Sequence, residues 1–280
     1  MRALLLTLAA LAACTERGTD DGTIELFFRP TVAGSYFSCS ETYPQPTATA
    51  KPQDFRVFIH AVRLVTAEGT EHALELLDDG QFQARNVALL DFEDGTGECL
   101  RGTPALNKTI RGTLSEADRS ERADYVGLRF RIGVPPELDL ADPATLPAPL
   151  DEPTLRSAVT GFHVFLAAWA KLEPYAADVP VFTGVGVDLG AEGCVGTCAR
   201  ANQPEVALDG FDLDSSTIVA DWRGVFDGLD LRFCSQSPGT PCGCWSRQID
   251  PLCPQIFPRL GLDLASGAST SGQVVFSVDG

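Results

Sequence analysis

The sequence contains three histidines, and two of them stand in apolar runs typical of strands. Strand alternation places His60 on a face shared with Phe58 and Val62. His163 lies in the run Gly161-Phe162-His163-Val164-Phe165. A neutral imidazole in such a run is a typical ligand for copper or zinc. The alternative for both residues is an interior or rim histidine whose hydrogen bonds are satisfied by the protein.

Local signatures of an enzyme are missing, and we expect no enzymatic activity. The sequence has no Gly-x-Ser-x-Gly elbow, no His-Glu-x-x-His helix and neither of the glycine-rich phosphate-binding turns. Residues distant in sequence can still form a catalytic triad. A hydrolase would therefore need a pocket that gathers Ser or Asp beside a histidine. His72, in a hydrophilic stretch, is expected to be exposed.

Nine cysteines divide into Cys14, near the N-terminus, and eight others. An even number in an exported chain predicts disulfides, but sequence does not fix their pairing. Cys242-Gly243-Cys244 also permits a thiolate metal site, although zinc sites favour pairs separated by two residues. The eight disulfide candidates are Cys39, Cys99, Cys194, Cys198, Cys234, Cys242, Cys244 and Cys253.

Acidic residues are in excess, and the net charge is −17. This charge argues against nucleic-acid binding, which needs clustered Lys and Arg. The negative charge favours binding of cations or basic partners. The alternative is that it serves only the solubility of the protein. Two acidic segments, 91–98 and 209–214, gather carboxylates that suit calcium, but neither follows the EF-hand order. The alternative for the first is an acidic turn pinned by a disulfide at Cys99.

The N-terminus has the pattern of a bacterial lipoprotein signal. Arg2 precedes an apolar run from Ala3 to Ala13, which is too short for a bilayer span of roughly 20 residues. The run ends before Cys14, which predicts lipidation of that thiol, and an ordinary signal peptide cut nearby is the alternative. We expect a signal peptide at 1–13, a tether at 14–22, and an anchor at the outer membrane or cell surface, facing the periplasm or exterior.

Period-two alternation recurs along residues 23–280, and helical patterns are scarce. Many short strands predict an all-β fold, a single β-sandwich or barrel-like domain with long loops and several disulfides. Six prolines between Pro135 and Pro153 predict an irregular crossing loop. Short helical pieces are expected at 114–123, 220–227 and 254–260. Strands are expected at 23–28, 55–65, 83–90, 125–134, 162–172, 181–189, 218–222, 229–233 and 273–278.

A set of short motifs occurs in a distinctive order. The N-terminal half contains Phe82-Gln83, Val87 to Asp94, Gly97, Cys99, Gly102-Thr103, Asn107, Gly112, Tyr125 to Phe130 and Gly133-Val134-Pro135. The C-terminal half contains Cys194, Cys198, Pro204 to Asp212, Val219 to Asp221, Gly243-Cys244, Asp250, Cys253, Ile256-Phe257 and Leu260 to Leu262. This order resembles the MbnP family, the four-Cys motif proteins of the metallo-mystery pair system, over nearly the whole mature chain.

The resemblance implies an extracytoplasmic β-sandwich that is associated with copper. It also implies a di-haem cytochrome c peroxidase-like partner, which in this family oxidises a tryptophan of the MbnP protein to kynurenine. Arg56 to Leu64 resembles the family strand in which a histidine can stand. His60 is therefore the first candidate copper ligand and His163 the second.

The chain departs from the family at two elements. The family's Leu-Asn-His-x-Asp stretch is replaced by 138–142, which has no histidine, and its Trp-x-Trp element by 155–160, which has no tryptophan. His163 is a candidate substitute from a shifted position, and Trp169 is the nearest remaining tryptophan. The alternative function is a surface lipoprotein with a structural or adhesion role that has lost metal binding.

Overall fold

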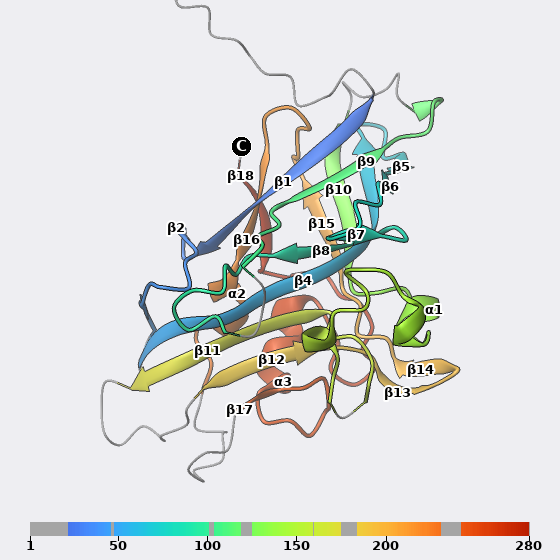
Figure 1. Ribbon diagram of the computed structural model, residues 1–280. Helices are drawn as coiled ribbons and strands as arrows, with labels where there is room; N and C mark the ends of the chain where they lie inside the picture. The colour runs from blue at the N-terminus through green and yellow to red at the C-terminus, as the bar shows by residue number, and fades with distance from the viewer. Residues whose placement is uncertain are drawn as a thin grey trace, which may run out of the picture.

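The structure, a computed structural model, describes residues 22–45, 48–100, 104–118, 125–158, 160–174, 184–230 and 242–279. Its strands form two main sheets and one separate hairpin (Figure 1). The predicted all-β, sandwich-like fold is confirmed. No helix among the described residues is long and apolar enough to cross a membrane.

The smaller sheet is built around β1 (Thr23–Val32). The strand order is β18 (Phe276–Asp279), β16 (Thr217–Asp221), β1, β9 (Thr109–Thr113) and β6 (Glu75–Leu76), and β2 (Ser35–Tyr36) also pairs with β1. Ile24, Leu26 and Phe28 alternate along β1 and are at most 3% exposed. This period of two directs one face of β1 into the core.

The larger sheet is organised by β4 (Ala48–Thr66), which has 19 residues. Its main order is β15 (Glu205–Asp209), β10 (Tyr125–Ile132), β4, β11 (Leu166–Pro174), β12 (Val185–Leu189) and β17 (Cys242–Cys244). The first half of β4 pairs with β11 and the second half with β10. Short strands complete the sheet: β3 (Tyr43–Pro44), β5 (Glu71–Ala73), β7 (Gln83–Ala84) and β8 (Val87–Asp91). The separate hairpin is β13 (Glu192–Val195) with β14 (Thr197–Arg200).

Aromatic side chains join the two sheets. Phe130 of β10 lies between Phe28 of β1 and Phe276 of β18, with ring centroids 6.0 and 5.2 Å apart and nearly perpendicular ring planes. Such edge-to-face pairs stabilise beyond the area that they bury. Trp222 is fully buried against Phe226, so it serves core packing.

Two of the strand predictions differ from the structure. Residues 83–90 form two strands, β7 and β8, because Arg85 and Asn86 adopt φ angles of +55° and +60° and reverse the chain. Such angles are typical of tight hairpins. Residues 229–230 form no strand, and 231–233 lie outside the described residues.

The helical pieces are short. The structure confirms α2 (Trp222–Phe226), and α3 (Cys253–Ile256) followed by the 3₁₀ turn Phe257–Leu260. Residues 114–117 are not helical, and most of the rest of that predicted piece lies outside the described residues. The proline-rich crossing contains α1 (Pro136–Asp139) and the 3₁₀ turns Pro143–Thr145 and Pro153–Leu155. Each begins at a proline, which suits a helix start because its missing amide proton is not needed there.

Candidate functional site

His163 is fixed by acceptors on both sides of its ring. Nδ1 lies 2.7 Å from Asp139 Oδ1 and Nε2 lies 2.9 Å from the carbonyl oxygen of Leu150. Asp139 also accepts the backbone amide of His163 at 2.7 Å. His163 is 1% exposed. Both ring nitrogens therefore lie against oxygen atoms of the protein, and neither faces an open position that a metal could occupy.

His60 has different neighbours. Its Nε2 lies 3.3 Å from Gln203 Oε1, while Gln203 Nε2 donates to the carbonyl of Val134. Gly133 makes room for this amide, because a Cβ there would lie 2.8 Å from Gln203 Cγ. Burial lowers the pKa of His60 to about 4, and the charge of Arg131 adds to this effect against the Gln203 hydrogen bond. The ring is therefore neutral at pH 7, with its proton on Nε2.

The two candidate copper ligands have separate sets of hydrogen-bond partners. His60 pairs with Gln203, whereas His163 pairs with Asp139 and Leu150. In the part of the chain that the structure describes, no group of three or more His, Cys, Asp or Glu side chains is arranged to hold a metal ion. The described residues therefore do not fit a copper centre shared by these histidines.

His72 is buried, so the expectation that it is exposed was wrong. It is 7% exposed, and its Nδ1 lies 2.9 Å from the Tyr125 hydroxyl. Position 72 lies in β5, which pairs with β4 opposite Leu64. The residues on either side of His72 in β5 are exposed, because alternate residues of a strand point to opposite faces. Their hydrophilic surroundings therefore gave no sign that His72 is buried.

The cysteines that the structure describes form disulfides rather than thiolate ligands. Three pairs lie among the described residues: Cys39–Cys99, Cys194–Cys198 and Cys244–Cys253. Cys242 is also disulfide-bonded, so the alternative thiolate site at Cys242-Gly243-Cys244 does not form. Cys14 and Cys234 lie outside the described residues.

The acidic segment at 91–98 is a turn held beside a disulfide. Asp94 Oδ1 accepts the amide and the hydroxyl of Thr96 at 3.0 and 2.6 Å. Gly97 has a φ of +56°, and a Cβ there would lie 2.1 Å from the carbonyl oxygen of Cys39. Glycine is required for this close approach. The turn thus brings Cys99 to Cys39.

A fully buried arginine was not singled out by the sequence analysis. Arg56 donates from Nε and Nη2 to the two carboxylate oxygens of Asp54 at 2.8 and 2.7 Å. Glu93 Oε1 lies 3.0 Å from Arg56 Nε, and Thr154 accepts from Nη1. Burial by itself would lower the pKa of Arg56, but the hydrogen bond and charge of Asp54, then Glu93 and Asp91, raise it. The polar residues at positions 54 and 56, inside an otherwise apolar strand, were the signal in the sequence that could have predicted this buried ion pair.

Among the described residues, this buried cluster holds more carboxylates than cations. Asp54, Asp91 and Glu93 are each at most 2% exposed and share the charge of Arg56. Burial raises the pKa of Asp91 to about 7, against the opposing effects of Arg56 and the Glu93 amide. Asp91 therefore exchanges its proton near neutral pH.

A cavity of about 500 Å³ opens beside His163. Trp169 of β11 and Trp245, which follows β17, both line it, with Arg156, which follows the 3₁₀ turn Pro153–Leu155, and Asp188 of β12. Its size falls within the range of small-molecule pockets, and such pockets combine apolar walls with a few polar groups. The cavity is therefore the strongest candidate binding site of the described residues.

Two glycines allow the tryptophans to approach the sheet. Trp169 pairs with Gly186, and Gly186 pairs with Gly243. A Cβ at Gly186 would lie 2.4 Å from Trp169 Cδ2, and one at Gly243 would lie 3.1 Å from Trp245 Cζ2. Trp169 Nε1 donates to Asp188 Oδ1 at 2.6 Å, which fixes the indole.

Gly186→Ala is expected to displace the Trp169 ring. The added methyl group has no space, and overpacking of this kind lowers the free energy of unfolding by about 1–3 kcal/mol. Near-UV circular dichroism and urea unfolding check the ring environment and the stability. An unchanged tryptophan spectrum together with wild-type stability would contradict the packing described.

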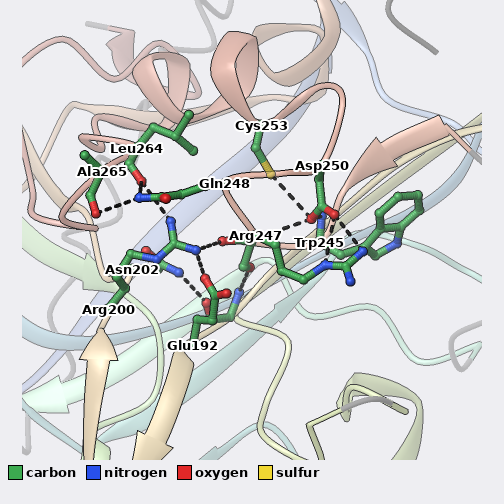
Figure 2. A network of polar contacts seen from close by, with 12 residues as sticks. Glu192, Arg200, Asn202, Trp245, Arg247, Gln248, Asp250, Cys253, Leu264 and Ala265 are labelled. Carbon is green, nitrogen blue, oxygen red and sulfur yellow. Dashed lines mark hydrogen bonds and ion pairs between the residues drawn. The ribbon is translucent and has the colours of Figure 1, made fainter.

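Trp245 is carried by a rigid loop (Figure 2). The Cys244–Cys253 disulfide closes it. Asp250, 2% exposed, accepts the backbone amides of Trp245 and Arg247 at 2.8 and 3.0 Å, and Arg247 Nη2 lies 2.7 Å from Asp250 Oδ1. The loop thus presents Trp245 to the cavity.

Arg200 ties this loop to the β13–β14 hairpin. Its Nη2 donates to the carbonyl of Ser246 at 2.7 Å and its Nη1 to that of Leu264 at 2.8 Å. It also forms an ion pair with Glu192, another residue of the cavity lining (Figure 2). One wall of the cavity is therefore held by a charged network.

Comparison with known proteins decides the family. The sequence model of MbnP matches residues 21–246. The chain belongs to the MbnP family. MbnP from Methylosinus trichosporium has the same fold, with a TM-score of 0.74 and 24% identity, over 91% of this chain and 97% of that one. No curated protein matches the chain. The family resemblance found in the sequence is thus confirmed.

This MbnP-family chain uses the two departing segments in other ways. Residues 138–142 supply Asp139, which anchors His163. Residues 155–160 supply Arg156, Ser157, Ala158 and Thr160 to the cavity wall. Sequence reasoning missed Asp139, Arg156 and Asp188, because nothing in their local pattern shows that they converge.

Proposed function

We propose that this chain is an exported, lipid-anchored, non-enzymatic binding protein of MbnP type that has no copper centre built from His60 and His163. The observation that carries the proposal is the position of His163. Asp139 Oδ1 and the Leu150 carbonyl oxygen lie within hydrogen-bond distance of its two ring nitrogens, so this histidine supports the structure. The alternative function inferred from the sequence, a surface protein that keeps the fold without the metal, suits this geometry best.

Export and anchoring are supported by two features. The apolar run before Cys14 has the pattern of a lipoprotein signal. The disulfides among the described residues are those of a chain that folds in an oxidising compartment. We propose attachment through Cys14 to the outer membrane or cell surface. Metabolic labelling with a fatty acid is expected to mark the wild type and to miss Cys14→Ser.

A copper-associated function remains the second candidate, because family membership and His60 favour it. With its proton on Nε2, neutral His60 carries a lone pair on Nδ1. The di-haem cytochrome c peroxidase-like partner of the family belongs to this candidate. Any further copper ligands would have to come from outside the described residues.

Copper titration separates the two candidates. We expect the purified mature chain to retain no more copper than His60→Ala or His163→Ala after dialysis, as measured by atomic absorption. Retention of one copper per wild-type chain, lost in His60→Ala, would replace the first candidate with the second. Loss of copper in His163→Ala combined with an unchanged fold would show that the His163 ring leaves its acceptors to bind metal.

A further inference from the structure

A second cavity, the Asp91 cavity, lies beside the buried cluster around Arg56. Its volume of about 190 Å³ is below the roughly 300–1,000 Å³ of most small-molecule pockets, so it admits only a small ligand. Arg56 of β4 and Asp91 of β8 line it together with Glu152 of the proline-rich crossing. The cavity therefore gives the buried cluster a side that faces solvent.

One oxygen of the buried Asp91 carboxylate faces this cavity. Asp91 is 2% exposed, and its Oδ1 accepts the backbone amide of Glu93 at 3.2 Å. Oδ2 accepts no hydrogen bond from a described residue, yet protein atoms do not enclose it, so it is open to the cavity that Asp91 lines. A carboxylate oxygen without a donor is unfavourable in such a buried position. A donor inside the cavity would satisfy it.

The charges of the described lining favour a cation. Three carboxylates, those of Asp91, Asp151 and Glu152, line the cavity with a single cation, Arg56. Arg56 is already ion-paired with two buried carboxylates of its cluster. The charge of Glu152 acts on Asp91 and contributes to raising its pKa. A positive charge bound in the cavity would relieve this repulsion.

The remaining walls favour an organic cation over a metal ion. Among the described residues, no group of three or more His, Cys, Asp or Glu side chains is arranged to hold a metal. Phe82, Leu89 and Pro149 add apolar surface beside the carboxylates. An alkylammonium ion matches both parts of the lining. Its hydrocarbon chain buries apolar surface, and its three N–H groups donate to carboxylate oxygens.

We propose that the Asp91 cavity binds a small primary alkylammonium ion. The ammonium group donates to Asp91 Oδ2 and is attracted by Glu152, and the alkyl chain contacts Phe82 and Leu89. Glu152 is held in place because its Oε1 accepts the amide and the hydroxyl of Thr154 at 2.9 and 2.7 Å. This site goes beyond the function proposed above and depends neither on copper nor on the lipid anchor.

Calorimetric titration of the mature chain with n-butylamine at pH 8 tests the proposal. The amine is an ammonium ion at this pH, because the ordinary pKa of an alkylamine such as the lysine side chain is about 10.4. We expect one site per chain. 1-Butanol, which lacks the charge, and butyltrimethylammonium, which lacks the N–H donors, are each expected to bind at least ~10-fold more weakly.

The affinity should also follow the charge of Asp91. Burial raises the pKa of this carboxyl to about 7, against the opposing effect of Arg56. Asp91 is therefore mostly ionised at pH 8 and mostly protonated at pH 6, so n-butylammonium should bind about 10-fold more tightly at pH 8. The charged groups around Asp91, from β4, the segment after β8 and the proline-rich crossing, are Asp54, Arg56, Glu93, Asp151 and Glu152.

Two variants assign the contacts. Asp91→Asn keeps an acceptor for the Glu93 amide, and it is expected to weaken n-butylammonium at least ~10-fold at pH 8 and to abolish the difference between pH 6 and pH 8. Glu152→Gln keeps an acceptor for Thr154 and is expected to weaken binding by a smaller factor. Asp227→Asn, which removes one carboxylate from a surface ion pair with Arg223, is the matched control and is expected to bind as the wild type does.

The proposal is overturned if n-butylamine fails to bind at millimolar concentration and pH 8. 1-Butanol binding as tightly would show an apolar pocket, and butyltrimethylammonium binding as tightly would show unspecific attraction by charge; either result rejects a site for N–H donors. Equal affinity at pH 6 and pH 8 would reject Asp91 as the contact. The ligand series on the wild type gives this answer even where a variant does not fold, and thermal unfolding identifies such a variant.

Discussion

Replacing Arg56 with methionine is expected to lower the free energy of unfolding by about 3–5 kcal/mol, the usual effect of removing one partner of a buried ion pair. The substitution removes Arg56, the buried cation that contacts Asp54 and Glu93 and acts on Asp91. The side chain is 1% exposed, so water does not replace the lost donors. Urea unfolding of wild type and variant at pH 7.5 measures the difference.

The control for Arg56→Met is Arg223→Met. Arg223 pairs with Asp227 at i,i+4 on the surface, with both side chains at least a third exposed, and such pairs contribute about 0.3–0.5 kcal/mol. The loss in Arg56→Met should also shrink at pH 5, because carboxylates left without a cation take up protons more readily. Equal effects of the two variants would show that the buried cluster has no special role.

Asp91→Asn is expected to change how stability depends on pH. The pKa of Asp91 is about 7 in the folded chain and 3.8 ordinarily, so the folded state binds an extra proton between these values. Stability is therefore lost as pH rises from about 4 to about 7, by about 4 kcal/mol in total. Asparagine keeps the acceptor for the Glu93 amide and removes this loss.

His60 contributes the opposite slope. Its pKa is about 4 when folded and 6.5 ordinarily, so the unfolded state binds the extra proton. Stability is lost as pH falls from about 6.5 to about 4, by about 3 kcal/mol. In the wild type the two groups nearly cancel between pH 4.5 and 6.5. Replacing either residue alone should therefore reveal the pH dependence that the other residue contributes to the stability.

Urea unfolding at pH 4.5, 5.5 and 6.5 measures these slopes. Relative to the wild type, the free energy of unfolding of Asp91→Asn should rise by about 1.4 kcal/mol per pH unit, and that of His60→Gln should fall by the same amount. The double variant should follow the wild-type slope, because both groups are then absent. Parallel curves for all four proteins would refute the assigned protonation states.

The family and the fold class could be predicted from the sequence. Alternation of apolar residues determines which face of a strand is buried. This local property identified β10 and β16 closely, but it found only the first part of β1 and the second part of β4. Turn residues determine where strands end. The turn at Arg85-Asn86 was not predicted because neither residue is a glycine. The order of short motifs identified the MbnP family, which the family match confirmed.

What the histidines do was decided only by tertiary structure. Sequence placed His60 and His163 in strand-like runs, but their hydrogen-bond partners lie 143 and 24 residues away, at Gln203 and Asp139. The same holds for the cavity, where Arg156, Asp188 and Trp245 meet from separate segments. Local pattern fixes which side chains face inward, because it depends on neighbouring residues. The partner of each polar group depends on how distant segments pack, and no local pattern contains that information.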